Sequence, residues 1–124
     1  MSNRNQTVAI LGASDDHGRY AYLAFKKLQA YGHKAIPVSP KLKTLEGTPA
    51  YATLKDIKEP VHTLTMYVGP AISDGLTEEI LALKPGRVIF NPGSENPALV
   101  QKLRAANIDF EEACTLVLLS TEQF

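Results

Sequence analysis

The sequence has one cysteine, no tryptophan and no long apolar run, and each absence excludes a class of protein. One cysteine cannot form an internal disulfide, and no spacing of cysteine and histidine matches a metal site. No apolar run approaches the roughly 20 residues that a membrane-spanning helix needs. The residues 1–6 lack the apolar stretch of a signal peptide, so we expect a cytoplasmic protein.

Neither sign of charge is in excess, because 13 Lys and Arg balance 13 Asp and Glu. A net charge of zero gives no long-range attraction to polyanions, so we expect neither nucleic acid nor a membrane as a partner. A local phosphate site is compatible with this balance. The length of 124 residues suits one core, and we predict a single domain over residues 1–124.

Short apolar runs alternate with helical spacing of apolar residues along the chain. The runs predict strands at residues 7–11, 34–39, 62–68, 87–90 and 108–113. The helical patterns predict helices at 19–31, 72–83 and from 97 onward, with a short helix at 53–57 inside a loop over 41–60. Two N-caps are predicted, Ser73 or Asp74 for the second long helix and Asn96, followed by Pro97, for the third. The run 115–119 fits a strand or a helix, and we interpret it as a short closing helix.

This alternation predicts an α/β protein with a doubly wound, mostly parallel five-stranded sheet, in flavodoxin-like or Rossmann-like order, with helices on both faces. Such sheets bind ligands beyond the carboxyl ends of their strands. We therefore expect the loops 12–18, 39–43, 68–72 and 91–96 to converge. Pro37 is in tension with its predicted strand, because it has no amide to donate to a neighbouring strand.

The first of these loops lies between a strand and a helix, which is the usual context for phosphate binding. It is not the dinucleotide fingerprint, because Ser14 and His17 stand where G-x-G-x-x-G has its second and third glycines. Gly18 allows close approach of the backbone, but Asp15 and Asp16 would repel a pyrophosphate unless Arg19 or His17 compensates. The alternative interpretation is a tight turn capped by Ser14 or Asp16.

The second loop carries lysines instead of the acid that an NAD site uses to bind ribose. It follows Val38 and Ser39 and reads Pro40-Lys-Leu-Lys43. Two lysines there suit a ligand with an extra phosphate on its adenosine ribose, such as coenzyme A (CoA) or NADP. The alternative is that these lysines are only solvated.

Several motifs together resemble a known family. They are Gly12-Ala-Ser14, Ile36-Pro-Val-Ser-Pro-Lys41, Leu45-Glu-Gly-Thr-Pro-Ala-Tyr51 and Asn91-Pro-Gly-Ser-Glu-Asn96. From Thr7 to about Leu119 the chain resembles the small single-domain CoA-binding family, which is similar to the CoA-binding domain of the succinyl-CoA synthetase α subunit. The resemblance implies a Rossmann-like fold. It also implies CoA phosphates at the first loop, adenosine at the second, and a pantetheine path between Val68 and Pro70.

The sequence therefore predicts binding of CoA or an acyl-CoA without catalysis, by the chain alone, as a homo-oligomer or with a partner subunit. The candidate ligand-binding residues are Gly12, Ala13, Ser14, Gly18, Arg19, Val38, Ser39, Pro40, Lys41, Val68 and Pro70. One alternative is an NADP or other nucleotide binder, to which the lysine argument applies equally. Another is an interaction or dimerisation module with a vestigial pocket, favoured by the acidic first loop and the apolar residues 116–119. An exposed 116–119 segment would mark an oligomer contact, whereas a buried one would close the core.

No catalytic residue is assigned. The synthetases of the resembling family use a phosphorylated histidine from a separate domain downstream, which this chain does not reach. His17 could pair with a phosphate or act as a base, but a solvated loop histidine is the simpler interpretation. Cys114 follows two glutamates that disfavour its thiolate, so we interpret it as a packed cysteine, and the resemblance implies a place for it near the pocket.

Overall fold

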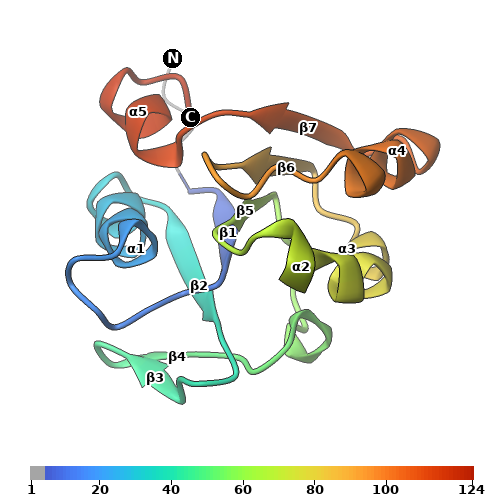
Figure 1. The fold of residues 1–124 in the computed structure, drawn as a ribbon. Helices are drawn as coiled ribbons and strands as arrows, with labels where there is room; N and C mark the ends of the chain where they lie inside the picture. The colour runs from blue at the N-terminus through green and yellow to red at the C-terminus, as the bar shows by residue number, and fades with distance from the viewer. Residues whose placement is uncertain (1–4) are drawn as a thin grey trace.

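Five parallel strands form the central sheet of the computed structural model, which describes residues 5–124 (Figure 1). Their order across the sheet is β2-β1-β5-β6-β7, so the chain runs to one edge, returns past β1 and continues to the other edge. This is the flavodoxin-like order, and it confirms the predicted α/β class with a Rossmann-like parallel sheet. The strands are β1 (Thr7–Leu11), β2 (Lys34–Val38), β5 (Thr63–Met66), β6 (Arg87–Phe90) and β7 (Asp109–Glu112).

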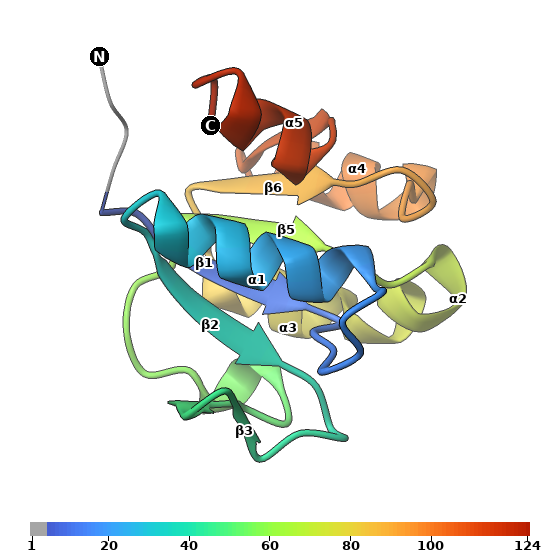
Figure 2. The same cartoon turned by 90° about the vertical axis from the view of Figure 1, so that its left-hand side faces the viewer.

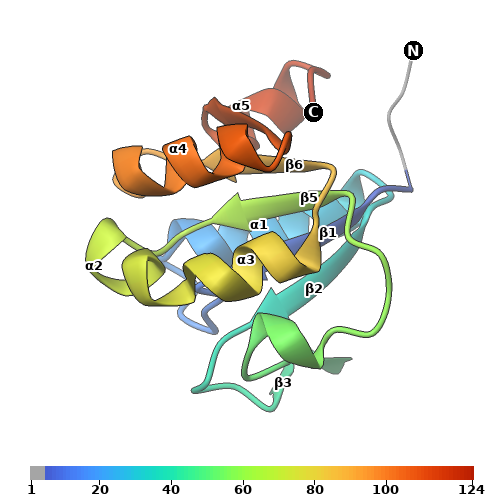
Figure 3. The ribbon, with the colours of Figure 1, turned by 90° about the vertical axis from the view of Figure 1, so that its right-hand side faces the viewer.

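Helices cover both faces of the sheet. Figure 2 shows α1 in front of the sheet with α5 above it, and Figure 3 shows α3 and α4 from the opposite side. The helices are α1 (Tyr20–Ala30), α2 (Pro70–Ser73), α3 (Thr77–Leu83), α4 (Pro97–Ala105) and α5 (Thr115–Ser120), with short 3-10 helices η1 (Leu54–Asp56) and η2 (Asp74–Leu76).

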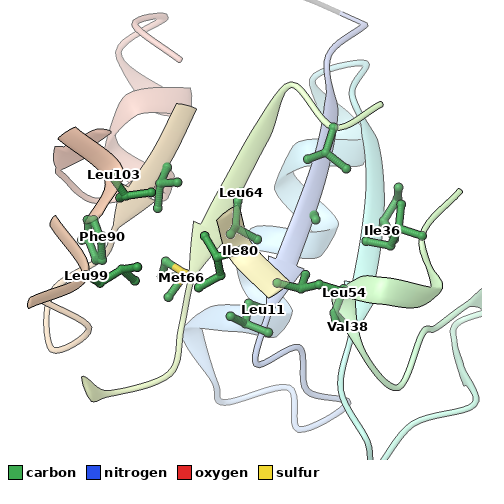
Figure 4. Packing of buried hydrophobic residues seen from close by; sticks show 14 residues of the cluster. Leu11, Ile36, Val38, Leu54, Leu64, Met66, Ile80, Phe90, Leu99 and Leu103 are labelled. Carbon is green, nitrogen blue, oxygen red and sulfur yellow. The ribbon is translucent and has the colours of Figure 1, made fainter. Parts of the chain in front are cut away.

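The apolar core lies in two layers, one on each side of the sheet. Successive strand residues point to opposite faces, so Val8 and Ile10 belong to the layer under α1 while Ala9 and Leu11 belong to the layer under α3 and α4. Figure 4 shows the second layer, where side chains of β1, β2, β5 and β6 meet those of η1, α3 and α4. Burial on both faces explains why the inner strands read as continuous apolar runs.

The position of β2 at the edge of the sheet resolves the tension at Pro37. The Pro37 carbonyl accepts a hydrogen bond of 3.0 Å from the Tyr51 amide, on the side away from β1. Because the nitrogen and carbonyl of one strand residue face the same side, the missing amide is not one that β1 needs. The Ser39 amide also bonds the Tyr51 carbonyl at 2.9 Å, so the chain at Tyr51 partly covers this edge.

A two-stranded hairpin lies where the sequence predicted only a loop and one short helix. It consists of β3 (Thr44–Leu45) and β4 (Thr48–Pro49), which pair antiparallel. Glu46 and Gly47 between them both have positive φ, +48° and +84°, as a tight two-residue hairpin turn requires. Strands of two residues are too short for alternation to reveal. The predicted helix at 53–57 is a single 3-10 turn, η1.

The predicted helix over residues 72–83 begins earlier and is interrupted. Pro70 is its first residue and Gly69 its N-cap, so the expectation of Ser73 or Asp74 as the N-cap is wrong. The Ser73 hydroxyl is instead buried and accepts a hydrogen bond of 2.8 Å from Asn96 Nδ2. The helix breaks into α2, η2 and α3 around Gly75, a residue that favours interruption of a helix.

The closing segment is helical, as expected. Leu119 of α5 is fully buried in the layer that α1 covers, whereas Val117 is 56% exposed. The segment therefore closes the core through one face. The predicted Asn96 cap is also confirmed, since its Oδ1 accepts the Leu99 amide at 3.1 Å.

Candidate functional site

The loops that follow the strands contact one another along the border of the sheet formed by the carboxyl ends of the strands, which we call the carboxyl edge. The amides of Gly12 and Ala13 both bond the Val38 carbonyl, at 3.0 and 3.2 Å, which joins the first loop to the end of β2. A Cβ at Gly12 would lie 2.8 Å from Val68 Cγ1, and a Cβ at Gly69 would lie 3.8 Å from the Gly93 carbonyl oxygen. The predicted convergence of the four loops is thus confirmed, at the carboxyl edge that the strand arrows point toward in Figure 2.

The first loop forms a turn that its own side chains cap. Ser14 Oγ accepts the Asp16 amide at 3.0 Å, and Asp16 Oδ1 accepts the Gly18 amide at 2.9 Å. The Asp16 carbonyl accepts the amide of Arg19, the N-cap residue of α1. Ser14 and Asp16 therefore both cap this turn, and an anion at the start of α1 would meet a loop that already holds a carboxylate.

The charges of this loop are exposed and only loosely paired. Asp16 Oδ2 lies 3.8 Å from Arg19 Nε, and the two side chains are 64% and 73% exposed. Ion pairs at such exposure contribute little to stability, so Arg19 can turn toward another anion at small cost. Asp15 is exposed as well.

A cluster of polar side chains ties the hairpin to α1 beside the first loop. Glu46 accepts hydrogen bonds from the Tyr22 hydroxyl and, at 2.6 Å, from Lys26 Nζ. The bond from Lys26, followed by that from Tyr22, lowers the pKa of Glu46, and the bond to Glu46 raises the pKa of Tyr22. The His17 ring stacks on the Tyr22 ring with centroids 4.3 Å apart. His17 is therefore placed by a ring contact on an exposed surface.

Ser39 organises the second loop. It is 7% exposed, its Oγ accepts the Lys41 amide at 3.2 Å and its carbonyl accepts the Leu42 amide at 3.3 Å. Pro40 and the side chains of Lys41 and Lys43 are exposed. The turn thus leaves both ammonium groups exposed to solvent at the carboxyl edge.

The third loop joins β5 to α2. The Tyr67 amide bonds the Leu11 carbonyl at 2.9 Å, so this loop starts beside the first one. Val68 is half-buried and Pro70 is exposed at the first position of α2. The two residues therefore offer an apolar rim, of which Val68 lies against Gly12.

A buried network of polar side chains, which sequence reasoning missed, lies on the other side of this loop. Asn91 Nδ2 donates to Thr65 Oγ1 at 2.6 Å and to the Met66 carbonyl at 2.9 Å, and Asn91 Oδ1 accepts the Thr115 amide at 2.8 Å. The hydroxyls of Thr65 and Thr115 are 2.7 Å apart. The Ser94 hydroxyl bonds the Asn91 carbonyl at 2.7 Å. The sequence signals were the motif that begins at Asn91 and the position of this asparagine directly after a predicted strand, and neither indicates the distant partners.

Tyr67 and Cys114 border this network. The Tyr67 hydroxyl is buried near Thr65 and Thr115, and burial raises the pKa of Tyr67 to about 12. The phenol is therefore neutral at physiological pH. Cys114 is half-buried and precedes α5 as its N-cap residue.

Further features of residues 5–124 lie apart from these loops or bear on other kinds of site. No group of three His, Cys, Asp or Glu side chains within this range could hold a metal ion. A hollow over α3, bordered by Lys55, Glu78 and Lys102, contains none of the predicted site residues. Within the same range, every helix is too short or too polar to cross a membrane.

One protein-family model matches most of the chain. The model of the family described as CoA binding domain matches residues 6–120. A solved crystal structure of a protein described as uncharacterized is 40% identical, with a TM-score of 0.92 over 98% of this chain and 100% of that one. Sequence and fold therefore agree over nearly the whole described range.

Two curated proteins match shorter stretches. YneT of Bacillus subtilis (strain 168), described as uncharacterized, is 30% identical over 78 residues, which are 63% of this chain and 58% of that protein. The ADP-forming acetate–CoA ligase of Methanocaldococcus jannaschii is 27% identical over 74 residues, 60% of this chain but 10% of the ligase. The match thus spans little more than half of the first relative and a small part of the second.

Proposed function

The chain belongs to the CoA binding domain family, and we propose that it binds CoA or an acyl-CoA at the carboxyl edge of its sheet without catalysing a reaction. The observation that carries the proposal is the contact between the loops after β1, β2 and β5. It joins a helix N-terminus, a pair of exposed lysines and an apolar rim, which suit the pyrophosphate, the ribose phosphate and the pantetheine arm.

The pyrophosphate is assigned to the first loop and the start of α1. Since the amides of Gly12 and Ala13 bond Val38, these two residues shape the loop instead of donating to the ligand. The amides of the first turn of α1 have no partner inside the helix and can donate to phosphate oxygens. Arg19, loosely paired with Asp16, adds a guanidinium that can form two hydrogen bonds to a phosphate.

The 3′-phosphate of the ribose is assigned to Lys41 and, through its neighbouring charge, Lys43. Both ammonium groups are exposed at the turn that Ser39 organises, and Val38 and Pro40 border the adenosine. The rim of Val68 and Pro70 takes the pantetheine arm. Nothing in this assignment requires a catalytic group.

Calorimetric titration with CoA and with dephospho-CoA, which lacks the 3′-phosphate, tests the proposal. We expect the protein to bind CoA about tenfold more tightly, because charge-assisted contacts to a phosphate are worth roughly 1.5 to 3 kcal/mol. In the double variant Lys41→Ala/Lys43→Ala the two ligands should bind equally.

The matched control is Lys58→Ala/Lys102→Ala, which removes the same charge from exposed lysines outside the carboxyl edge and should keep the preference for CoA. Titration with NADP and NAD forms a further arm. Binding of NADP but not CoA would replace CoA by NADP as the ligand. Absence of binding to all of these compounds would refute a nucleotide site.

A further inference from the structure

The buried network around Asn91 joins three segments that are far apart in sequence. Thr65 and Met66 lie on β5, Asn91 follows β6, and Thr115 begins α5, with separations of 24 to 26 residues between the bonded partners. Asn91 is 2% exposed and Thr65 and Thr115 are fully buried. One asparagine side chain therefore holds the carboxyl ends of two neighbouring strands and the start of a helix at fixed distances.

The same network holds the backbone that reaches the ligand rim. Met66, whose carbonyl Asn91 bonds, is two residues before Val68. The Asn91 carbonyl accepts both the amide and the hydroxyl of Ser94, at 2.9 and 2.7 Å, and so folds the loop that contains Gly93. That loop in turn lies against Gly69. The bonds from Ser94 go to the backbone of Asn91 and stay in any variant, but the Asn91 side chain fixes where both loops start, at Met66 and at residue 91 itself. Loss of this side chain would therefore loosen the starting points of both loops.

The loops on the adenosine side do not use this network. They are held by backbone bonds to Val38 and Tyr51 and by the capped turn at Asp16. Neighbouring strands are about 4.8 Å apart, so roughly 5 to 10 Å of sheet separate β1 from β5 and β6. The two sides of the site therefore rest on different sets of hydrogen bonds.

We infer that Asn91 is a positioning residue for the pantetheine half of the bound ligand and has no part in binding the adenosine half. This rests on the proposed function. In this role the buried Asn91 side chain does not touch the ligand. It acts through the loops whose positions it fixes.

The test compares CoA with adenosine 3′,5′-bisphosphate, which is the adenosine half alone, in calorimetric titrations of the wild type and of Asn91→Asp. The carboxylate keeps the shape of the amide but cannot donate to Thr65 and Met66. We expect the Kd for CoA to rise at least about tenfold while that for the bisphosphate changes less than about twofold. A general loss of order would weaken both ligands together.

Leu103→Ala is the matched control for lost stability. Leu103 is fully buried at the far end of α4, so its truncation lowers the urea midpoint without touching the network. It should leave both affinities unchanged. Equal weakening of both ligands in Asn91→Asp, or unchanged binding of CoA, would overturn the inference alone. If the wild type binds neither compound, the proposed function fails and this inference fails with it.

Discussion

The loops after β1 and β2 and the loops after β5 and β6 lie on the same edge of one sheet but are held by different bonds. On the first side, most bonds join backbone groups, as at Val38, and its one buried side-chain acceptor, Ser39, bonds only a backbone amide two residues away, while Asp16 is exposed. On the second side, Asn91 and its partners are buried and bond through side chains.

This difference affects what each side tolerates. Exposed charges can exchange a protein partner for a ligand at little cost, because water stabilises them in both states. Buried polar groups cannot, because a lost partner leaves an unsatisfied group away from water. The first side can therefore adapt to a charged ligand, while the second fixes a shape.

The largest expected effect is at Gly12, where the two sides meet. Gly12→Ala places a Cβ 2.8 Å from Val68 Cγ1 and 3.0 Å from the Tyr67 carbonyl oxygen, at a φ of +92° that disfavours side chains. We expect the free energy of unfolding in urea to fall by about 2 to 5 kcal/mol. Gly47→Ala is the control, because it has φ +84° and no atom within 4 Å, and it should cost only about 1 kcal/mol. Equal costs would show that the two sides are not tightly packed at Gly12.

A pair of hydroxyl deletions measures the difference between the sides directly. Thr115→Val removes a fully buried hydroxyl 2.7 Å from Thr65 Oγ1 and should lower the free energy of unfolding by about 1 to 3 kcal/mol. Ser14→Ala removes a cap in the exposed turn and should cost about 0.5 kcal/mol or less, because water replaces the bond. Urea denaturation of both variants checks this. A costlier loss at Ser14 would contradict the comparison.

The exposed charge of Asp16 on the first side should affect the affinity for the ligand more than the free energy of unfolding. Asp16→Asn keeps an oxygen for the Gly18 amide but removes a negative charge beside the proposed pyrophosphate site. We expect CoA to bind about two- to fivefold more tightly at low salt, with the gain shrinking as salt screens the charge. Asp109→Asn, an exposed acid at the start of β7, should leave the affinity unchanged. Weaker binding by Asp16→Asn would instead mean that the capped turn itself is needed.

The smallest expected effect concerns Tyr67 and Tyr22, whose pKa values are raised for different reasons. It does not appear at neutral pH. Burial raises the pKa of Tyr67 to about 12, whereas the bond to Glu46 raises that of Tyr22. In a phenolate absorbance titration, Glu46→Gln should lower the pKa of Tyr22 alone. Because Tyr67 ionises first in the unfolded chain, near its ordinary pKa of 10, it should reduce stability as pH rises from 10 to about 12. Tyr67→Phe should make the slope smaller, with the remainder due to groups such as Tyr22, and an unchanged slope would contradict burial as the cause.

Much of the first side, the loops after β1 and β2, could be predicted, because its features are local in sequence. The first strand ends before Gly12, the turn that Ser14 and Asp16 cap spans a few residues, and Lys41 comes three residues after the end of the second strand. Patterns of this length appear in a single pass along the chain. The β3–β4 hairpin, which was not predicted, is local too, but its strands of two residues are too short to show alternation of apolar and polar residues.

The sequence by itself determined the alternation of strands and helices, the CoA-binding resemblance and the cap at Asn96, because each depends on neighbours a few residues apart. Only the tertiary structure decided the strand order, the edge position of β2 that accommodates Pro37, and the network around Asn91. The bonds of the Asn91 side chain join residues 24 to 26 positions apart, and they form only when packing brings β5, β6 and α5 together and excludes water from between them.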